Sequence, residues 1–160
     1  MAAADWLRSL GLTVPEPLLP AGHNQRRSVF RIPESPDHRG AWLKVFAPQP
    51  WWFPLAHPVA WLRVPDPAVR EAAMHAVLAR SGLAQPGIAG FRRDPASRET
   101  WLLIEDLSPM RPLEPGDPHA LWAALAPVLD RGWVLPDLAP QHVFAASGAA
   151  HVAVIDLHRC

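Results

Sequence analysis

The sequence of 160 residues contains no tyrosine, one cysteine and one lysine. The single cysteine, Cys160, excludes an internal disulfide framework and favours a reducing compartment. Acidic and basic residues balance at 15 each, so no surplus of charge points to nucleic acid or to an anionic membrane. No apolar run approaches the roughly 20 residues that a membrane-spanning helix needs. These absences predict a soluble cytoplasmic protein with no nucleic-acid partner and no membrane span.

The one lysine is conspicuous because all the remaining residues among the 15 Lys and Arg are arginines. Proline is also abundant, with 20 residues, more than double its usual share of about 5%. The prolines cluster between segments of clear periodicity, so they separate structural elements and do not indicate disorder. The length suits one domain, which we expect to have two lobes, and residues 1–12 suit a short helix better than a signal peptide.

Several segments have strand and helix signals. Residues 28–32 and 42–46 are typical of strands, and the turn-rich segment between them predicts an antiparallel hairpin. Residues 101–104 form an apolar run that predicts a buried strand, followed by the acids Glu105 and Asp106.

Asp66 and Pro67 form an N-cap and a first helical residue, which predicts a helix over 68–80 that ends before Gly82. Asp117 and Pro118 repeat this signal for a helix to about residue 131, ended by Gly132 and bent at Pro127. A second hairpin is expected from residues 143–146 and 152–155. The order of strands, helix, strand, helix and hairpin favours an α+β fold over a doubly wound sheet.

Two charged residues lie within apolar patterns. Strand alternation puts Lys44 on one face with Trp42 and Phe46, where an ammonium requires an anionic partner unless its stem lies along the aromatic rings and its head reaches solvent. Glu71 aligns with Met74 and Leu78 on the predicted helix. It would meet a cation such as Lys44, or it would only complement the helix dipole.

The C-terminal segment carries Asp137, His142 and Asp156. Asp137 begins a loop, His142 begins a strand and Asp156 ends the returning strand, so the three would converge at one end of a hairpin. Such a set suits holding Mg²⁺ and orienting a hydroxyl group. Two alternatives are a solvated loop with capping aspartates, and a metal site built from His142, His151 and His158. The spacings within this histidine set fit no tight ligand motif.

Five motifs in order resemble the lipopolysaccharide kinase family, the protein-kinase-like enzymes that phosphorylate heptose or Kdo in the inner core of lipopolysaccharide. They are WLKVF, WWFPLAHPVAWLR, VREAAMHAVLARSGL, LLIEDL and VIDLHR, the last with an upstream D-L-x-x-x-H. The resemblance covers about residues 26–160, and IDLHR is its most specific part.

The resemblance implies a protein-kinase-like N-lobe, made of an antiparallel sheet plus one helix, over residues 1–107. A shortened C-lobe with a helix, a catalytic loop and a hairpin would occupy residues 108–160. The implied activity is transfer of the γ-phosphate of ATP, with Mg²⁺, to a hydroxyl of a lipopolysaccharide core sugar or another small acceptor. Peripheral association with the inner membrane would accompany that substrate.

Site residues follow from the same resemblance. Lys44 would hold the α- and β-phosphates of the nucleotide, and Glu71 would orient Lys44. A compact ammonium on a flexible stem suits this task better than the planar fork of arginine. The hinge whose backbone meets adenine would be formed by Glu105, Asp106 and Leu107.

The C-terminal trio would complete the site. Asp137 would be the catalytic aspartate that receives the sugar hydroxyl proton, and Asp156 would be the principal Mg²⁺ ligand. His142 would stand beside the metal. Histidine is a poorer Mg²⁺ ligand than oxygen, so the alternative to direct metal binding is that His142 orients Asp137 or a phosphate.

Three departures from the family pattern keep an alternative open. Residues 21–28 hold one glycine, with Arg26 and Arg27 as the compensating charges, and Leu135 and Pro136 stand where kinases of this class usually carry His and Arg. The sequence also ends four residues after Asp156. The alternative is a truncated, inactive pseudokinase that binds nucleotide or protein, with a partner chain or self-association covering its incomplete C-lobe.

Overall fold

The computed structural model describes most of the first two thirds of the chain and shorter pieces of the last third. The described residues are 2–24, 26–50, 66–80, 85–108, 110–112, 122, 125, 126, 129, 130, 132, 142–145 and 152–155. The chain divides into two compact units. Unit 1 contains Met1–Ala68 and Gly87–Asp106, and unit 2 contains Val69–Pro86 and Leu107–Cys160.

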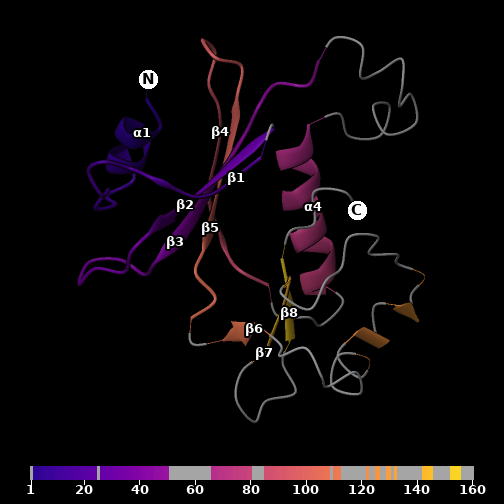
Figure 1. The fold of residues 1–160 in the computed structure, drawn as a ribbon. Helices are drawn as coiled ribbons and strands as arrows, with labels where there is room; N and C mark the ends of the chain where they lie inside the picture. Colours follow the sequence, from indigo (N-terminus) through magenta and orange to yellow (C-terminus); the bar gives the residue numbers. More distant parts are fainter. Residues whose placement is uncertain are drawn as a thin grey trace. The chain divides into compact units, whose positions relative to one another are not determined.

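Unit 1 is built on a five-stranded antiparallel sheet with the order β1-β2-β3-β5-β4 (Figure 1). Its strands are β1 Pro20–Asn24, β2 Arg27–Ile32, β3 Ala41–Phe46, β4 Ile88–Arg93 and β5 Thr100–Glu105. The predicted β2–β3 hairpin and the predicted strand at β5 are confirmed. The two edge strands, β1 and β4, were not predicted, because each contains a glycine and neither has a clear apolar alternation.

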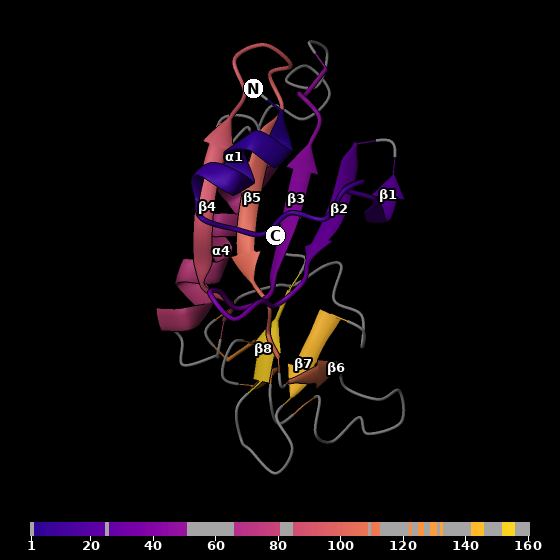
Figure 2. The same cartoon turned by 90° about the vertical axis from the view of Figure 1, so that its left-hand side faces the viewer.

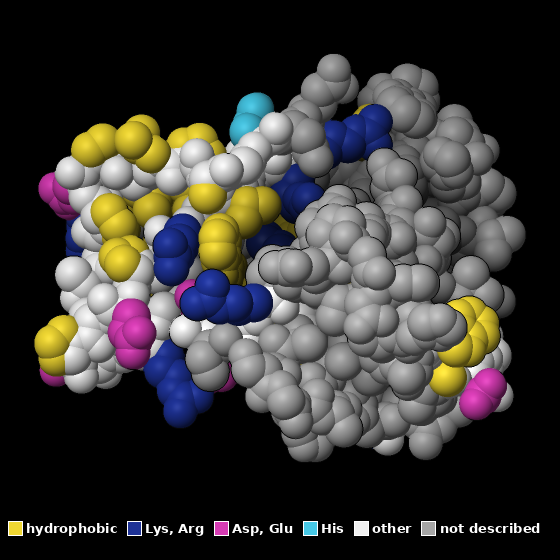
Figure 3. All heavy atoms as spheres, turned by 60° about the horizontal axis from the view of Figure 1, so that its bottom comes forward, with side chains coloured by type: hydrophobic (Ala, Val, Ile, Leu, Met, Phe, Trp, Pro, Cys, Tyr) yellow, Lys and Arg dark blue, Asp and Glu magenta, His cyan; other side chains and the backbone are white. Residues whose placement is uncertain are grey.

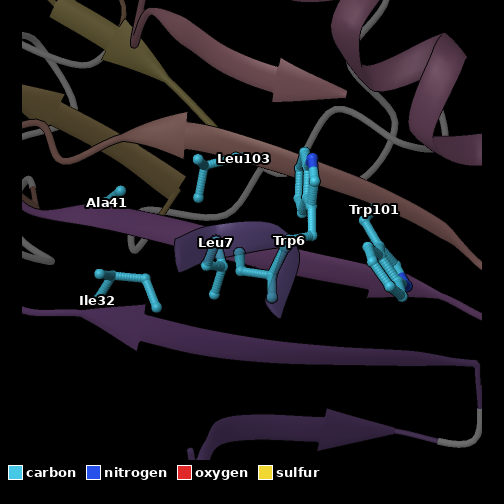
Figure 4. Packing of buried hydrophobic residues seen from close by; sticks show 7 residues of the cluster. Trp6, Leu7, Ile32, Ala41, Trp101 and Leu103 are labelled. Atoms are coloured by element: carbon cyan, nitrogen blue, oxygen red, sulfur yellow. The ribbon is translucent and has the colours of Figure 1, made fainter. Parts of the chain in front are cut away.

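One face of the sheet is covered by the short helix α1, Ala3–Ser9, which Figure 2 shows lying over β4 and β5. Its residues Trp6 and Leu7 pack with inward residues of β2, β3 and β5 into one buried cluster (Figure 4). The Trp6 and Trp101 rings lie 5.6 Å apart between centroids. Gly90 on β4 leaves room for this packing, because a Cβ there would lie 3.0 Å from the Trp6 ring. The helix predicted near the N-terminus is confirmed and closes the core.

The other face of the sheet carries Lys44. Directly opposite residues on antiparallel strands point to the same face, and the register pairs Arg27 with Phe46, Val29 with Lys44 and Arg31 with Trp42. Lys44 is therefore flanked on its own face by two arginines of β2, both of them diagonal neighbours.

Helix α4, Pro67–Arg80, begins where its sequence predicts. The Asp66 carboxylate accepts a hydrogen bond from the Ala68 backbone N–H at 2.9 Å, which is the predicted N-cap. Its second oxygen accepts from the Thr100 hydroxyl at 2.6 Å. Asp66 thereby joins the start of the helix to the start of β5.

Unit 2 contains a three-stranded antiparallel sheet of β6 Arg111–Pro112, β7 Val143–Ala145 and β8 Val152–Val154. The β7–β8 pairing confirms the predicted second hairpin, and Val143 and Val154 are fully buried. Residues 122, 125, 126 and 129 are helical, in agreement with the predicted helix to residue 131. Gly132 follows with φ +79°, as a helix-ending glycine does, whereas Pro127 and its predicted bend lie outside the described residues.

Within the described part of the chain, no helix has the length and apolar character needed to cross a membrane.

Candidate functional site

Lys44 lies in the middle of β3 and is buried, with 5% of its surface exposed. The alternative of a head that reaches solvent is therefore wrong for this residue. Its neighbours across the sheet are Val29 on β2 and Leu102 on β5, and Leu102 is fully buried. A buried ammonium among apolar neighbours is stable only with anionic or strongly polar partners, so this face of the sheet is suited to meeting an anion.

Arg27 and Arg31 reinforce the positive character of the Lys44 face. Arg31 is exposed and Arg27 is half-buried. On the surface shown in Figure 3, Lys and Arg side chains lie next to hydrophobic ones. Three cations on one face of the sheet suit a polyanionic ligand.

Glu71 lies on the second turn of α4 and is fully buried. The predicted stripe is confirmed, because Met74 and Leu78 on the same helix face are buried as well. One helical turn further, His75 has its Nε2 3.7 Å from Glu71 Oε1. The other ring nitrogen, Nδ1, lies 2.7 Å from Gln85 Oε1. Glu71 is thus the first member of a buried polar chain.

The predicted hinge begins with Glu105 and Asp106, whose backbone N–H groups already have partners inside unit 1. Glu105 N donates to Gly87 O and Asp106 N donates to Gly40 O, each at 2.8 Å. An adenine ring could not take either donor without breaking one of these bonds. A role in adenine binding would therefore fall to the carbonyls of this segment and to Leu107, which is half-buried.

The Asp106 side chain is held by residues of β2 and β3. Trp42 Nε1 donates to Asp106 Oδ1 at 3.3 Å, and Arg31 lies 3.9 Å from Asp106 Oδ2. The Arg31 guanidinium also lies over the Trp42 ring, 5.8 Å from its centroid. The close approach of Asp106 to Gly40 is favoured by the glycine, since a Cβ there would lie 3.2 Å from Asp106 Oδ2. The segment after β5 is thereby fixed against the turn before β3.

His142 is half-buried at the start of β7, and its carbonyl accepts from Ile155 N at 2.9 Å. The hairpin therefore sets His142 opposite the residue that precedes Asp156 in the sequence. Asp137 and Asp156 themselves lie outside the described residues, as do His151 and His158. Among the described residues no group of three metal-ligating side chains occurs, so the predicted Mg²⁺ site stays a prediction.

The predicted residues are divided between the two units. Lys44 and Glu105 lie on strands of the sheet of unit 1 and Asp106 directly follows β5, whereas Glu71 and His142 belong to unit 2. Sequence reasoning missed His75 and Gln85. His75 lies four residues after Glu71 on the same helix face, a spacing that was available as a signal, but Gln85 lies beyond the helix and offered none.

No protein-family model and no curated protein matches the chain. Solved structures do match, among them WaaP in complex with acyl carrier protein, with 22% sequence identity and a TM-score of 0.52. The match covers 97% of this chain and 65% of the WaaP chain, so the chain spans just under two thirds of that protein's length. At this identity the likeness shows the fold alone. Among the described residues, the helices together with the five-stranded antiparallel sheet agree with the predicted α+β fold.

Proposed function

We propose that this chain is an ATP-dependent phosphotransferase that resembles lipopolysaccharide core sugar kinases and transfers a phosphoryl group to a sugar hydroxyl. The observation that carries the proposal is the fold, which is similar over 97% of the chain to that of WaaP, a lipopolysaccharide core kinase. The buried Lys44 on the central strand of the sheet adds chemical support. In this proposal residues 1–107 act as the N-lobe and residues 108–160 as a partial C-lobe.

Lys44 and Glu71 fit a nucleotide with Mg²⁺ by their chemistry. The Lys44 ammonium would hold the α- and β-phosphates, and Glu71 would hold the ammonium in place. Both side chains are almost wholly buried, which strengthens their interactions with a bound triphosphate relative to those in water. Glu105, Asp106 and Leu107 would lie along the adenine.

The transfer step would use the C-terminal residues. The sugar hydroxyl oxygen would form a bond to the γ-phosphorus and pass its proton to the Asp137 carboxylate, while the bond between the γ-phosphorus and the bridging oxygen breaks and ADP leaves. Asp156 and His142 would hold Mg²⁺, which when bound neutralises the charge on the phosphates. His142 lies on the hairpin beside Ile155, and this neighbourhood supports the pairing of His142 with Asp156.

A thermal-shift experiment tests the nucleotide part of this proposal. A ligand present at 100 times its Kd stabilises the folded state by about 2.7 kcal/mol, so saturating Mg-ATP should raise the Tm of the wild-type chain clearly. Lys44→Ala should abolish the increase. Arg39→Ala is the matched control, because Arg39 is an exposed cation in the turn between β2 and β3. An equal Mg-ATP shift in the wild type and Lys44→Ala, or no shift in the wild type, would contradict the proposal.

A second function, a pseudokinase that binds nucleotide without transferring phosphate, is favoured by Leu135 and Pro136. The usual histidine braces the catalytic loop, so its loss would misalign Asp137. A Mg-ATP thermal shift with no ADP formation in the presence of heptose- or Kdo-containing acceptors would select this function. Measurable, acceptor-dependent ADP formation would exclude it.

The WaaP structure contains acyl carrier protein, which supports proposing a protein partner for this chain too. Size-exclusion chromatography of the chain with purified acyl carrier protein tests this point. Co-elution at the combined mass would support the partner, and two separate peaks at micromolar concentrations would exclude a stable complex.

A further inference from the structure

One helical turn after Glu71, helix α4 carries a buried imidazole, that of His75. His75 has 2% of its surface exposed and Glu71 has none, and the two side chains lie one helical turn apart with 3.7 Å between Nε2 and Oε1. An ionisable pair without solvent contact is costly unless its members interact with each other and with further polar groups. Gln85 supplies such a group, since its amide lies 2.7 Å from His75 Nδ1.

The chemistry of these contacts is compatible with a hydrogen on Nε2 of the imidazole in two arrangements. If Gln85 Oε1 accepts from Nδ1–H, the ring still faces a carboxylate oxygen with Nε2, and attraction requires a hydrogen on that nitrogen as well. If the Gln85 amide is turned so that its NH₂ group donates to Nδ1, the neutral ring carries its single hydrogen on Nε2. In each of these two arrangements the ring presents an Nε2–H group to Glu71 across 3.7 Å, an ion-pair distance that is longer than a hydrogen bond.

We propose that His75 is a positioning residue: held by Gln85, it directs its Nε2–H at the Glu71 carboxylate and fixes the orientation in which Glu71 meets the lysine of the nucleotide site. This inference rests on the proposed function, in which Glu71 orients Lys44. It adds a role for two residues, His75 and Gln85, that do not touch the nucleotide. Substitution of either should therefore act on nucleotide affinity only through Glu71.

Two substitutions of similar size separate positioning from simple packing. His75→Gln keeps an N–H donor at the place of Nε2, whereas His75→Leu fills the same space without a donor. We expect His75→Gln to bind Mg-ATP within about threefold of the wild type and His75→Leu to bind about tenfold more weakly, as expected for loss of a charge-assisted contact. If His75 only fills space, Leu should be tolerated and both variants should keep the wild-type Kd.

A double-mutant cycle tests whether the effect passes through Glu71. In a Glu71→Gln background, His75→Leu should weaken Mg-ATP binding by less than about twofold, because the carboxylate it positions is already gone. Full additivity of the two substitutions would overturn the proposal. If His75→Leu does not fold, Gln85→Leu replaces it, since loss of the Nδ1 contact should also release the ring and weaken binding.

Nitrogen NMR of the histidine ring gives a result that does not depend on nucleotide binding. In the wild type, Nε2 of His75 should appear as a protonated nitrogen, and Glu71→Gln should shift its resonance more than that of exposed His23. A bare Nε2 would overturn the proposal.

If the wild type shows no Mg-ATP thermal shift while Nε2 is protonated and coupled to Glu71, the proposed function fails and the His75–Glu71 contact stands. If Mg-ATP binds and Lys44→Ala abolishes binding while His75→Leu does not weaken it, only the positioning role fails.

Discussion

Asp66 and Thr100 are joined by a hydrogen bond of 2.6 Å between Oδ2 and Oγ1, although 34 residues separate them. The other oxygen of the same carboxylate caps helix α4 through the Ala68 N–H. One aspartate thus fixes both the first turn of the helix that carries Glu71 and its attachment to the strand that leads to the predicted hinge.

Loss of this carboxylate should destabilise the protein. Asp66→Ala removes the cap, which typically contributes about 1 kcal/mol, and leaves the buried Thr100 hydroxyl without its acceptor, which costs about 1–3 kcal/mol more. We expect a fall of about 2–4 kcal/mol in the free energy of unfolding, measured by urea denaturation. Thr100→Val, which breaks only the second bond, should cost about half as much. An Asp66→Ala protein as stable as the wild type would contradict this assignment.

Arg27 should contribute to nucleotide affinity if the proposed function holds. The register places Arg27 opposite Phe46 and diagonal to Lys44 on the same face, within about 7–8 Å for such neighbours. Arg27→Gln should weaken Mg-ATP binding about three- to tenfold at low salt and have less effect at high salt, because the partner is a polyanion. Isothermal titration at two ionic strengths measures this. Arg39→Gln removes the same charge from the exposed turn and should leave Kd unchanged; an equal effect of both substitutions would indicate only a long-range charge effect.

The stabilisation that Asp94 provides in the turn between β4 and β5 should be lost in acid. Asp94 Oδ2 accepts from the Ser97 backbone N–H and from the Ser97 hydroxyl, each at 2.9 Å. These hydrogen bonds, the backbone one foremost, lower the pKa of Asp94 below its ordinary value. A carboxyl group whose pKa is lower in the folded state stabilises the fold above its unfolded pKa, about 3.9, and this contribution is lost as the pH falls through the folded pKa.

Ser97→Ala removes the hydroxyl donor to Asp94. The variant should be less stable than the wild type near neutral pH, and the difference should shrink as the pH falls below about 4. Urea midpoints over a pH series measure this difference. Since the Ser97 hydroxyl also lies 3.1 Å from Glu99 Oε2, the series should be repeated in a Glu99→Gln background. A difference that does not vary with pH would rule out the Asp94 interaction as its source.

Arg98, in the same turn, adopts φ 60°, a left-handed conformation that costs a residue with a Cβ about 1–2 kcal/mol. Arg98→Gly relieves this cost but increases the entropy of the unfolded chain by about 0.5–1 kcal/mol. We therefore expect a net gain of about 0.5 kcal/mol in the free energy of unfolding. Arg98→Val should lose about 1 kcal/mol, because β-branched residues suit this conformation least. The Tm of the Gly variant should be higher than that of the wild type, and the Tm of the Val variant should be lower. A Val variant as stable as the Gly variant would be inconsistent with the turn geometry.

The sequence alone determined the elements whose signals are local. The Asp66–Pro67 start of α4, the β2–β3 hairpin, the buried β5 strand and the β7–β8 hairpin all depend on capping chemistry, turn residues and side-chain alternation, which act within a few residues. The edge strands β1 and β4 carry little such information, with His23 and Arg92 among their polar residues. They form because β2 and β5 offer unpaired backbone groups beside them.

Only the tertiary structure showed that Lys44 and Glu71 are buried. Alternation placed Lys44 on a face with aromatic residues but could not show whether that face would be covered, since burial depends on segments distant in sequence. The same reason applies to Glu71, whose burial could not be inferred from its position on α4. Its enclosure and the His75–Gln85 contact arise from packing between segments on either side of the helix end, and no periodicity in the sequence encodes such packing.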